Sequence, residues 1–212
     1  MTPFQTVTAI AVPFDEPNVD TNQLCPTRFN KVPRGPRFAD ILFHDRRFTA
    51  DGAKRPEFIL NREPYSKAGI IVADRNFGGG SSRETAVYAL TAFGIRAVIA
   101  SSFGDIFTNN SFKNGLLPVI LPPATCAGLR DQLRAQVGAT LTVDLEKQIV
   151  RDVEGVEHRF EVHALRKRSL LGGLDDVALT RSFAAPLSEF ETEYRRQFPW
   201  LYGAGEAANP LS

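Results

Sequence analysis

The chain has 212 residues, of which 43% are hydrophobic and 23% are charged. This length can bury one good-sized core, and the composition is ordinary for a soluble globular protein. The formal net charge of +1 gives no electrostatic basis for binding nucleic acid or an anionic membrane. The sequence has no apolar run long enough to span a bilayer and no signal-peptide pattern at its start. We therefore expect a cytoplasmic protein.

The first part of the chain predicts one strand followed by a long irregular region. Residues 4–13 alternate enough to indicate an opening strand, and residues 15–26 are rich in turn-forming residues. Residues 30–64 are irregular, with many Arg, Pro and Gly. A long loop of this kind in a compact domain is either functional or mobile. Within it, residues 41–43 predict a short anchoring helix.

Residues 69–121 predict a parallel βαβ core. The apolar runs 69–73 and 96–100 indicate buried strands, with a helical pattern at 85–93 between them. A parallel pair of strands needs such a crossover helix. A second helix is predicted at 106–114, with Gly115 as its C-terminal cap, and a third strand at 116–121. The fold class is therefore α/β.

The turn at residues 76–84 carries the candidate site. Its glycines let the chain turn sharply and bring backbone N–H groups close to a ligand. Ser81 and Glu84 have the spacing of a capping box that opens the following helix. Helix N-termini hold anions, and the planar cation of Arg83 suits carboxylate or phosphate. We interpret the segment as an anion-binding turn, although the pattern alone leaves open an ordinary Ser-capped turn of an α/β protein.

The last part of the chain continues with alternating elements. A helix is predicted at 124–136, and strand-like segments follow at 141–146, 148–153 and 157–162. Residues 174–198 predict a helix that breaks near Pro186. We expect residues 1–198 to form a single domain and residues 199–212 to be a flexible tail.

Few side chains in this chain are suited to bind a metal. Cys25 and Cys126 are expected to be free thiols, because disulfides are rare in the cytosol. Two thiolates cannot hold an iron–sulfur cluster alone, since such clusters usually need three or four. The histidines are scattered, and we expect His158 and His163 to be solvated. We predict no metal site and no cofactor within the chain.

Four separated motifs resemble the swivelling domain of the aconitase superfamily, and they occur in the order found there. They are residues 18–29, 76–84, 102–118 and 173–176. Over nearly its whole length the chain is similar to the small subunits of 3-isopropylmalate dehydratases. The resemblance implies a swivelling β/β/α domain with residues 69–121 as its βαβ core. Three positions depart from the usual family pattern, with Gly79 in place of Cys, Thr85 in place of His and Gly172 in place of Asn.

The resemblance also implies an activity and its residues. The expected enzyme is a hydro-lyase that dehydrates or isomerises a 2-hydroxy diacid. The favoured substrates are 3-isopropylmalate and 2-isopropylmalate of leucine biosynthesis. Ser81 is implied as the base, in its alkoxide form, and Ser82, Arg83 and Arg28 as binders of substrate carboxylate. Pattern alone favours a plain surface cation for Arg28. A Lewis-acidic [4Fe-4S] cluster is expected in a separate large subunit, without which this chain is inactive.

Substrate choice is assigned to residues 30–64, which in the family cover the variable group of the substrate. Ile41, Leu42 and Phe43 are the candidate specificity residues and favour an apolar diacid. Two alternatives stay open. The departures from the family pattern favour a paralogous small subunit that acts on a methylmalate- or dimethylmalate-type substrate. A non-catalytic carboxylate-binding module would keep the arginines and would not need Ser81.

Overall fold

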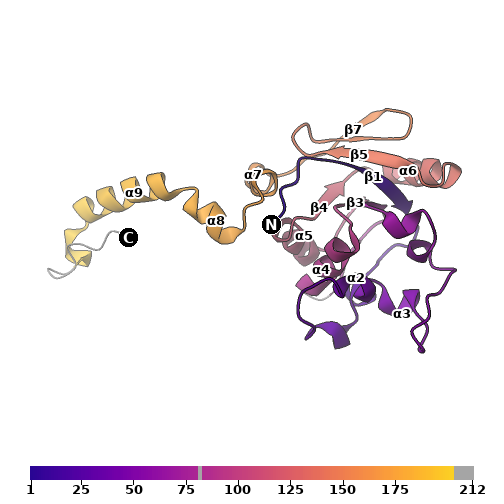
Figure 1. Cartoon of the computed structure of the whole chain (residues 1–212). Coiled ribbons are helices and arrows are strands. Elements are labelled where there is room, and N and C mark those ends of the chain that lie inside the picture. The colour runs from indigo at the N-terminus through magenta and orange to yellow at the C-terminus, as the bar shows by residue number, and fades with distance from the viewer. Residues whose placement is uncertain (81–82, 203–212) are drawn as a thin grey trace. The chain divides into compact units, whose positions relative to one another are not determined.

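The structure is a computed structural model and describes residues 1–80 and 83–202 (Figure 1). The chain divides into two compact units, Met1–Leu174 and a C-terminal unit that begins at Asp175. The expected domain boundary at residue 198 stays a prediction. Among the described helices, none is both long enough and apolar enough to cross a membrane.

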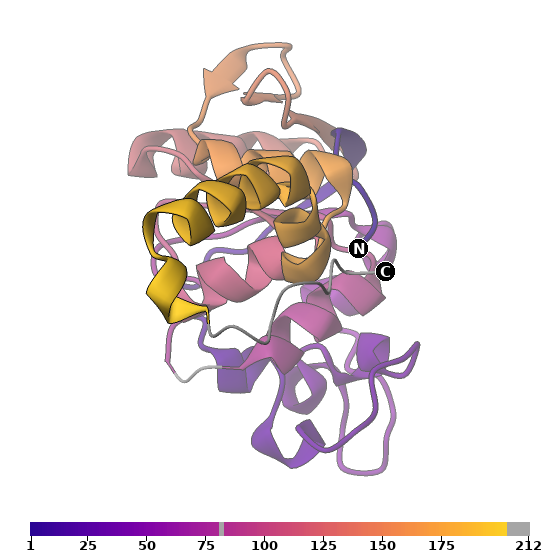
Figure 2. The same ribbon diagram turned by 90° about the vertical axis from the view of Figure 1, so that its left-hand side faces the viewer.

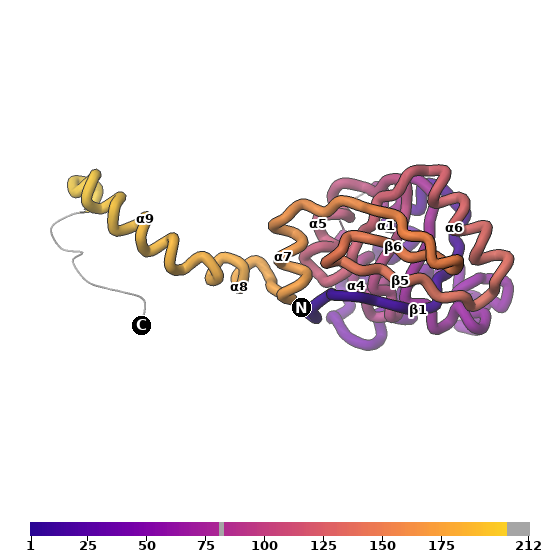
Figure 3. Tube along the Cα trace, turned by 90° about the horizontal axis from the view of Figure 1, so that it is seen from above, coloured from indigo at the N-terminus to yellow at the C-terminus, as the bar shows by residue number. Residues whose placement is uncertain are grey.

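A mixed sheet forms the centre of the first unit. In its described part the strands lie in the order β4-β3-β2-β1-β5-β6-β7. The first four are parallel and the last three continue from β1 as an antiparallel extension. Figure 3 shows β5 and β6 of this extension beside β1. The strands are β1 (Thr6–Pro13), β2 (Ile70–Val72), β3 (Ala97–Ala100), β4 (Leu117–Ile120), β5 (Thr140–Asp144), β6 (Ile149–Arg151) and β7 (Glu157–Arg159).

Alternating side chains of the parallel strands build two cores, one on each face of the sheet. Ile71 belongs to one core, while its neighbours Ile70 and Val72 belong to the other. Helix α4 (Glu84–Phe93) covers the first face. Helices α6 (Pro123–Ala135) and α7 (Ala164–Gly172) contribute to the second. Burial on both faces explains why the strand segments are continuous apolar runs rather than alternating ones. The predicted α/β class and its βαβ core are confirmed.

Helix α4 begins at Glu84, which is later than the predicted capping box requires. The prediction of a capping box at residues 81–84 is therefore wrong. The N-cap of α4 is Arg83, in an extended conformation (φ −139°, ψ 104°), with no side-chain cap hydrogen bond. The Glu84 carboxylate accepts from Asn114 Nδ2 at 2.8 Å, a tertiary contact with the residue that follows α5 (Asp105–Lys113). Ser81, the other residue of the predicted capping box, lies outside the described residues.

The C-terminal part of the chain differs from the prediction in two ways. Helix α7 has no counterpart among the predicted elements, because its polar sequence shows no apolar period and only Leu170 is buried. The predicted break near Pro186 falls instead at residues 182–183, between α8 (Asp176–Arg181) and α9 (Ala184–Gln197). Pro186 lies in the first turn of α9, where a backbone N–H has no intrahelical partner, so its ring is tolerated.

Residues 14–67 form a packed group of short helices and turns over the first core. The members are α1 (Thr21–Leu24), η1 (Thr27–Phe29), α2 (Phe38–Ile41), α3 (His44–Arg47), η2 (Ile59–Asn61) and η3 (Tyr65–Lys67). The predicted helix at 41–43 is displaced, because α2 ends at Ile41. The buried guanidinium of Arg47 donates to the carbonyl oxygens of Ala39 (2.6 Å) and Leu42 (3.1 Å), which fixes the chain after α2. The mobility expected of the irregular segment at residues 30–64 stays a prediction.

Candidate active site

Three of the four sequence motifs meet beyond the carboxyl ends of β1, β2 and β3. Gly79 pairs with Asp20 in an isolated parallel bridge, and the Thr21 N–H donates to the Gly79 carbonyl oxygen at 3.0 Å. On the other side, Phe77 pairs with Phe103 in a second parallel bridge. Backbone bonds therefore join the glycine turn to the loops on both sides. Carboxyl ends of parallel strands are the usual place for a ligand in an α/β sheet.

Gly78 gives the turn its shape. Its φ of +72° lies in the left-handed region, and a Cβ at this position would come within 2.2 Å of the Phe107 ring. Phe107 is buried, with its ring centroid 5.6 Å from that of Phe77 and 6.1 Å from that of Phe103. Phe107 lies in the first turn of α5, and the three aromatic rings pack against one another next to the glycine turn.

Arg83 is held against the loop that follows β1. Its Nη1 donates to Asn22 Oδ1 at 2.9 Å and to the Cys25 carbonyl oxygen at 3.3 Å. The same Asn22 oxygen accepts from the N–H and the hydroxyl of Thr27, at 3.1 and 3.0 Å. Asn22 thus ties Arg83 to the residue that precedes Arg28. Sequence reasoning gave Asn22 no role, because one asparagine among several in a turn-rich stretch has no distinguishing signal.

Arg28 lies at the surface and contacts the irregular segment. Its side chain is 53% exposed and forms a two-point ion pair with Asp45, with Nη1 2.9 Å from Oδ2. The hydrogen bond from Arg28 holds the pKa of the Asp45 carboxyl below its usual range, and a bond from His44 adds to this effect. The guanidinium also lies over the Phe29 ring, 4.6 Å from its centroid. Arg28 is therefore oriented for a carboxylate, and here that carboxylate comes from its own chain.

The structure shows the surroundings of the three residues that depart from the family pattern. A Cβ on Gly79 would lie 3.0–3.3 Å from the side chain of Asn76, whose Nδ2 donates to Asn18 Oδ1 at 2.9 Å. The Thr85 hydroxyl donates to Asn30 Oδ1 at 3.1 Å, so it links α4 to the start of the irregular segment. Gly172 belongs to α7, at a distance in sequence and fold from the turn. In the fourth motif, the Gly173 carbonyl oxygen accepts from the terminal amine of Met1 at 2.9 Å.

The candidate specificity residues are buried. Ile41 is 4% exposed, and Leu42 and Phe43 are fully buried. The Phe43 ring stacks on Phe14 with centroids 5.1 Å apart. Their side chains therefore belong to the first core and do not line a surface that a ligand could contact.

Two of the predicted site residues, Ser81 and Ser82, lie outside the described residues. Arg83 contacts Asn22 and Cys25 in the loop at 20–28, and Arg28 is the last residue of that loop. Asn109 in α5 accepts from Arg166 Nη2 at 2.6 Å.

The described residues contain no group of three His, Cys, Asp or Glu side chains close enough to bind a metal ion. Cys25 and Cys126 are free and buried in different cores. Burial raises the pKa of the Cys25 thiol, against smaller effects of Thr85 and Arg83, and raises that of Cys126 to about 11. This donor set does not fit an iron–sulfur cluster, which needs accessible thiolates.

The expectation of solvated histidines was wrong for His158. Its Nε2 lies 3.0 Å from Oδ2 of the buried Asp152, and only 24% of the His158 side chain is exposed. His163 is the N-cap of α7, where its Nδ1 accepts from the Leu165 N–H. Both therefore have structural roles within the fold.

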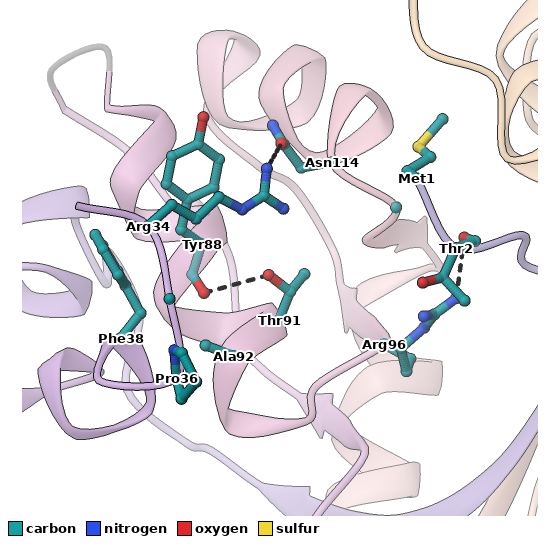
Figure 4. Close-up of a pocket in the computed structure, with 12 residues that line it drawn as sticks. Met1, Thr2, Arg34, Pro36, Phe38, Tyr88, Thr91, Ala92, Arg96 and Asn114 are labelled. Carbon is teal, nitrogen blue, oxygen red and sulfur yellow. Dashed lines mark hydrogen bonds between the residues drawn. The ribbon is translucent and has the colours of Figure 1, made fainter.

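A cavity of about 390 Å³ lies elsewhere, beside α4 (Figure 4). Arg34 and Tyr88 line it, with the guanidinium 4.3 Å from the ring centroid, and Arg34 Nη1 donates to Asn114 at 3.3 Å. Arg96 and Thr2 border it just before β3 and β1, at the amino ends of the parallel strands. Asn114 and Gly115, at the end of the 102–118 motif, line it as well, whereas none of the candidate site residues within the described part of the chain does. The bridges that join the three motifs lie at the opposite edge of the sheet, which makes that edge the candidate active site.

Family models cover most of the chain. Residues 1–124 match the aconitase C-terminal domain, and residues 127–164 match a second model, described as LeuD_N. The 3-isopropylmalate dehydratase small subunit of Gluconacetobacter diazotrophicus is 45% identical, over 94% of this chain and 97% of its own length. That of Rhodospirillum rubrum is 46% identical, over 95% and 97%. The chain belongs to the 3-isopropylmalate dehydratase small-subunit family.

A solved structure agrees with this family assignment. The 3-isopropylmalate dehydratase chain of Methanocaldococcus jannaschii aligns with a TM-score of 0.62 at 25% identity, over 87% of this chain and 98% of its own. The resemblance read from the four motifs and the predicted swivelling-domain fold are both confirmed. As a member of this family, the chain is a subunit of a hydro-lyase in the aconitase superfamily.

Proposed function

We propose that this chain supplies the carboxylate-binding side and the proton-abstracting base of a two-subunit enzyme that interconverts 2-isopropylmalate and 3-isopropylmalate in leucine biosynthesis. The observation that carries the proposal is the meeting of three sequence-distant motifs around Arg83, at the carboxyl edge of the sheet. The names of the relatives supply the substrate. The expected cytoplasmic location is part of the same proposal.

Arg83 is proposed to bind one substrate carboxylate. A guanidinium has five N–H donors, and the contacts with Asn22 and Cys25 both use Nη1. Among the described residues, no acceptor within hydrogen-bond distance of Nη2 competes with a ligand. A planar fork held on one side is suited to two-point carboxylate binding on the other.

Arg28 is proposed to bind a second carboxylate by exchanging its partner. The Asp45 carboxylate already occupies the guanidinium in the two-point manner expected of a substrate. Both side chains are more than half exposed, and exposed pairs contribute only about 0.2–1 kcal/mol, so a diacid can displace Asp45 at small cost. Since Asp45 belongs to the irregular segment, this exchange would couple substrate binding to that segment.

Ser81 is proposed as the base that removes the proton from carbon, and Ser82 as a further carboxylate ligand. A serine alkoxide is costly near neutral pH and needs nearby donors and positive charge. The described surroundings supply Arg83, the first turn of α4 and the backbone of the glycine turn. The reaction also needs the substrate hydroxyl to leave. A [4Fe-4S] cluster acts on that hydroxyl as a Lewis acid when bound, and its ligands are proposed to come from the large subunit, because the cysteines of this chain do not fit it.

Substrate choice is proposed to depend on residues 30–64. The buried Ile41, Leu42 and Phe43 hold the backbone of this segment in place. Other side chains of the segment are proposed to face the variable group of the substrate. One observation favours a second candidate, a methylmalate- or dimethylmalate-type substrate. Thr85 replaces a family histidine, and its hydroxyl binds Asn30 at the start of this segment, so the segment is anchored differently here.

The test is the reconstituted two-subunit enzyme carrying Ser81→Ala. We expect turnover to fall by several orders of magnitude while assembly and substrate affinity persist, as for the loss of other bases. Ser66→Ala is the matched control, because its hydroxyl contacts Glu63 away from the turn. Turnover within tenfold of wild type would refute the assignment of the base. Binding of a diacid by a wild-type complex that never turns over would instead indicate the non-catalytic module.

A panel of isopropylmalate, methylmalate and dimethylmalate then separates the two substrate classes. Exchange of residues 30–64 with those of a relative of known preference should transfer that preference. A preference that stays unchanged after the exchange would place the specificity determinant in the large subunit.

A further inference from the structure

The C-terminal unit carries a row of stacked aromatic side chains. Phe190 and Tyr194 of α9 and its C-cap residue Phe198 follow one another at four-residue spacing, which puts them on one face of the helix. Their ring centroids lie 5.5 and 4.8 Å apart. Trp200, in the turn η4 (Pro199–Leu201), continues the row at 5.4 Å from Phe198. We call these four residues the aromatic row; α9 is the yellow helix in Figure 2.

The aromatic row is only partly covered, since Tyr194 and Phe198 are half-buried and the two residues at its ends are exposed. Phe190 is 62% exposed and Trp200 is 73% exposed, and Leu187 on the same face is 44% exposed. None of the described residues of α8 or α9 is buried. An isolated helix of this length is marginal in water, so packing on an apolar face has to supply most of its stability. The opposite face is polar, with Glu189, Thr192 and Arg196 at helical spacing.

The row is large enough to form the centre of a specific interface. A fully covered aromatic side chain buries about 150–250 Å², so four of them bury roughly 600–1,000 Å² at most. A stable protein–protein interface buries about 800 Å² on each partner, and aromatic residues are enriched at its centre. A surface patch of this size on a monomer indicates a binding surface.

We infer that the aromatic row docks into an apolar groove of the large subunit. This inference rests on the proposed function, since it takes the large subunit as the partner. The matched relatives are named small subunits, a term that implies a larger one, and the Gluconacetobacter protein covers 94% of this chain. The unmatched remainder is shorter than the stretch that follows α9, so proteins of that name carry the counterpart of this helix. A docked α9 fastens the chain to its partner through a unit separate from the one that holds Arg83.

The experiment measures assembly of the full chain with its large subunit. The double variant Phe190→Ala/Tyr194→Ala should raise the dissociation constant by at least 100-fold, because interface aromatics commonly dominate binding. The double variant Glu189→Ala/Thr192→Ala, on the opposite face of the same helix, should change it less than threefold. At saturating large subunit the turnover of the aromatic variant should recover, since the site around Arg83 is intact.

Hydrogen exchange on the wild-type chain gives an independent readout. Backbone amides of residues 184–202 should exchange rapidly in the isolated chain and become protected when the large subunit is added. Protection that depends on the concentration of the isolated chain would indicate a second copy as the partner, and protection at all concentrations would indicate packing within the chain; either result overturns the inference. Equal affinity of wild type and the aromatic variant in an active complex overturns it as well. A wild-type complex that assembles without turnover, while the aromatic variant does not assemble, refutes the proposed function alone.

Discussion

Substitution of Gly78 by alanine should destabilise the first unit and disable the site together. The residue has φ of +72°, and an added Cβ would lie 2.2 Å from Cγ and 2.6 Å from both Cδ atoms of Phe107. Phe107 is 1% exposed and packs against both Phe77 and Phe103, so its ring has little room to move. The Gly78 N–H donates to the Val19 carbonyl oxygen at 2.7 Å, so any backbone shift is passed to the loop after β1.

Two effects set the magnitude. A left-handed conformation costs a residue with a Cβ about 1–2 kcal/mol. Overpacking of a filled core costs about 1–3 kcal/mol more. The expected loss is therefore roughly 2–5 kcal/mol, a large part of the roughly 5–15 kcal/mol that stabilises a typical domain.

Urea unfolding of the purified chain measures this loss as a lower midpoint at unchanged slope. Gly128→Ala is the control, because nothing lies within 4 Å of its added Cβ and it sits inside α6. There, alanine should stabilise the chain by about 0.5–1 kcal/mol. A Gly78→Ala chain within about 0.5 kcal/mol of wild type would show that the turn relaxes freely and that the steric reasoning is wrong. The reconstituted Gly78→Ala enzyme should also lose most of its turnover, because Arg83 and the loop at 20–28 are positioned through this turn.

Two further predictions concern titratable groups. Burial alone would raise the pKa of Asp152, but hydrogen bonds from His158, Gln132 and two backbone N–H groups outweigh it and hold that pKa below the usual range. A lowered folded-state pKa stabilises the fold above the unfolded value of about 3.9 and stops doing so as pH falls through the folded value. The stability gap between wild type and Asp152→Asn should therefore be full near pH 6 and close at acid pH; a gap that does not change between pH 6 and pH 2 would contradict this. Because burial raises the pKa of both thiols, neither Cys25 nor Cys126 should react with iodoacetamide at pH 8 until urea unfolds the chain, and modification of either in the native chain, seen by mass spectrometry, would show that its core opens.

The sequence by itself determined the βαβ core and the position of the glycine turn at residues 76–84. Apolar runs such as 69–73 and 96–100 can be placed from sequence because strands buried on both faces need continuous apolar residues. The glycine turn can also be placed from sequence, because glycine is the residue that suits position 78. There the left-handed backbone and the close Phe107 ring leave no room for another side chain. The four motifs were sufficient to name the family, since they are local stretches of chain.

Only the tertiary structure decided where the partners of these residues lie. Helix α4 begins after Arg83, and Glu84 bonds Asn114, a residue thirty positions away, which no local pattern indicates. The pairing of Arg28 with Asp45 depends on how the segment after β1 folds back on itself. The pairing of Arg83 with Asn22 depends on how the loops after β1 and β2 are brought together, and no sequence period encodes either contact. Ile41, Leu42 and Phe43 suit both an apolar pocket and a core by composition, and the packing against Phe14 places them in the core. Local propensity and apolar period act over a few residues, whereas contacts between distant loops are set by the packing of the whole chain.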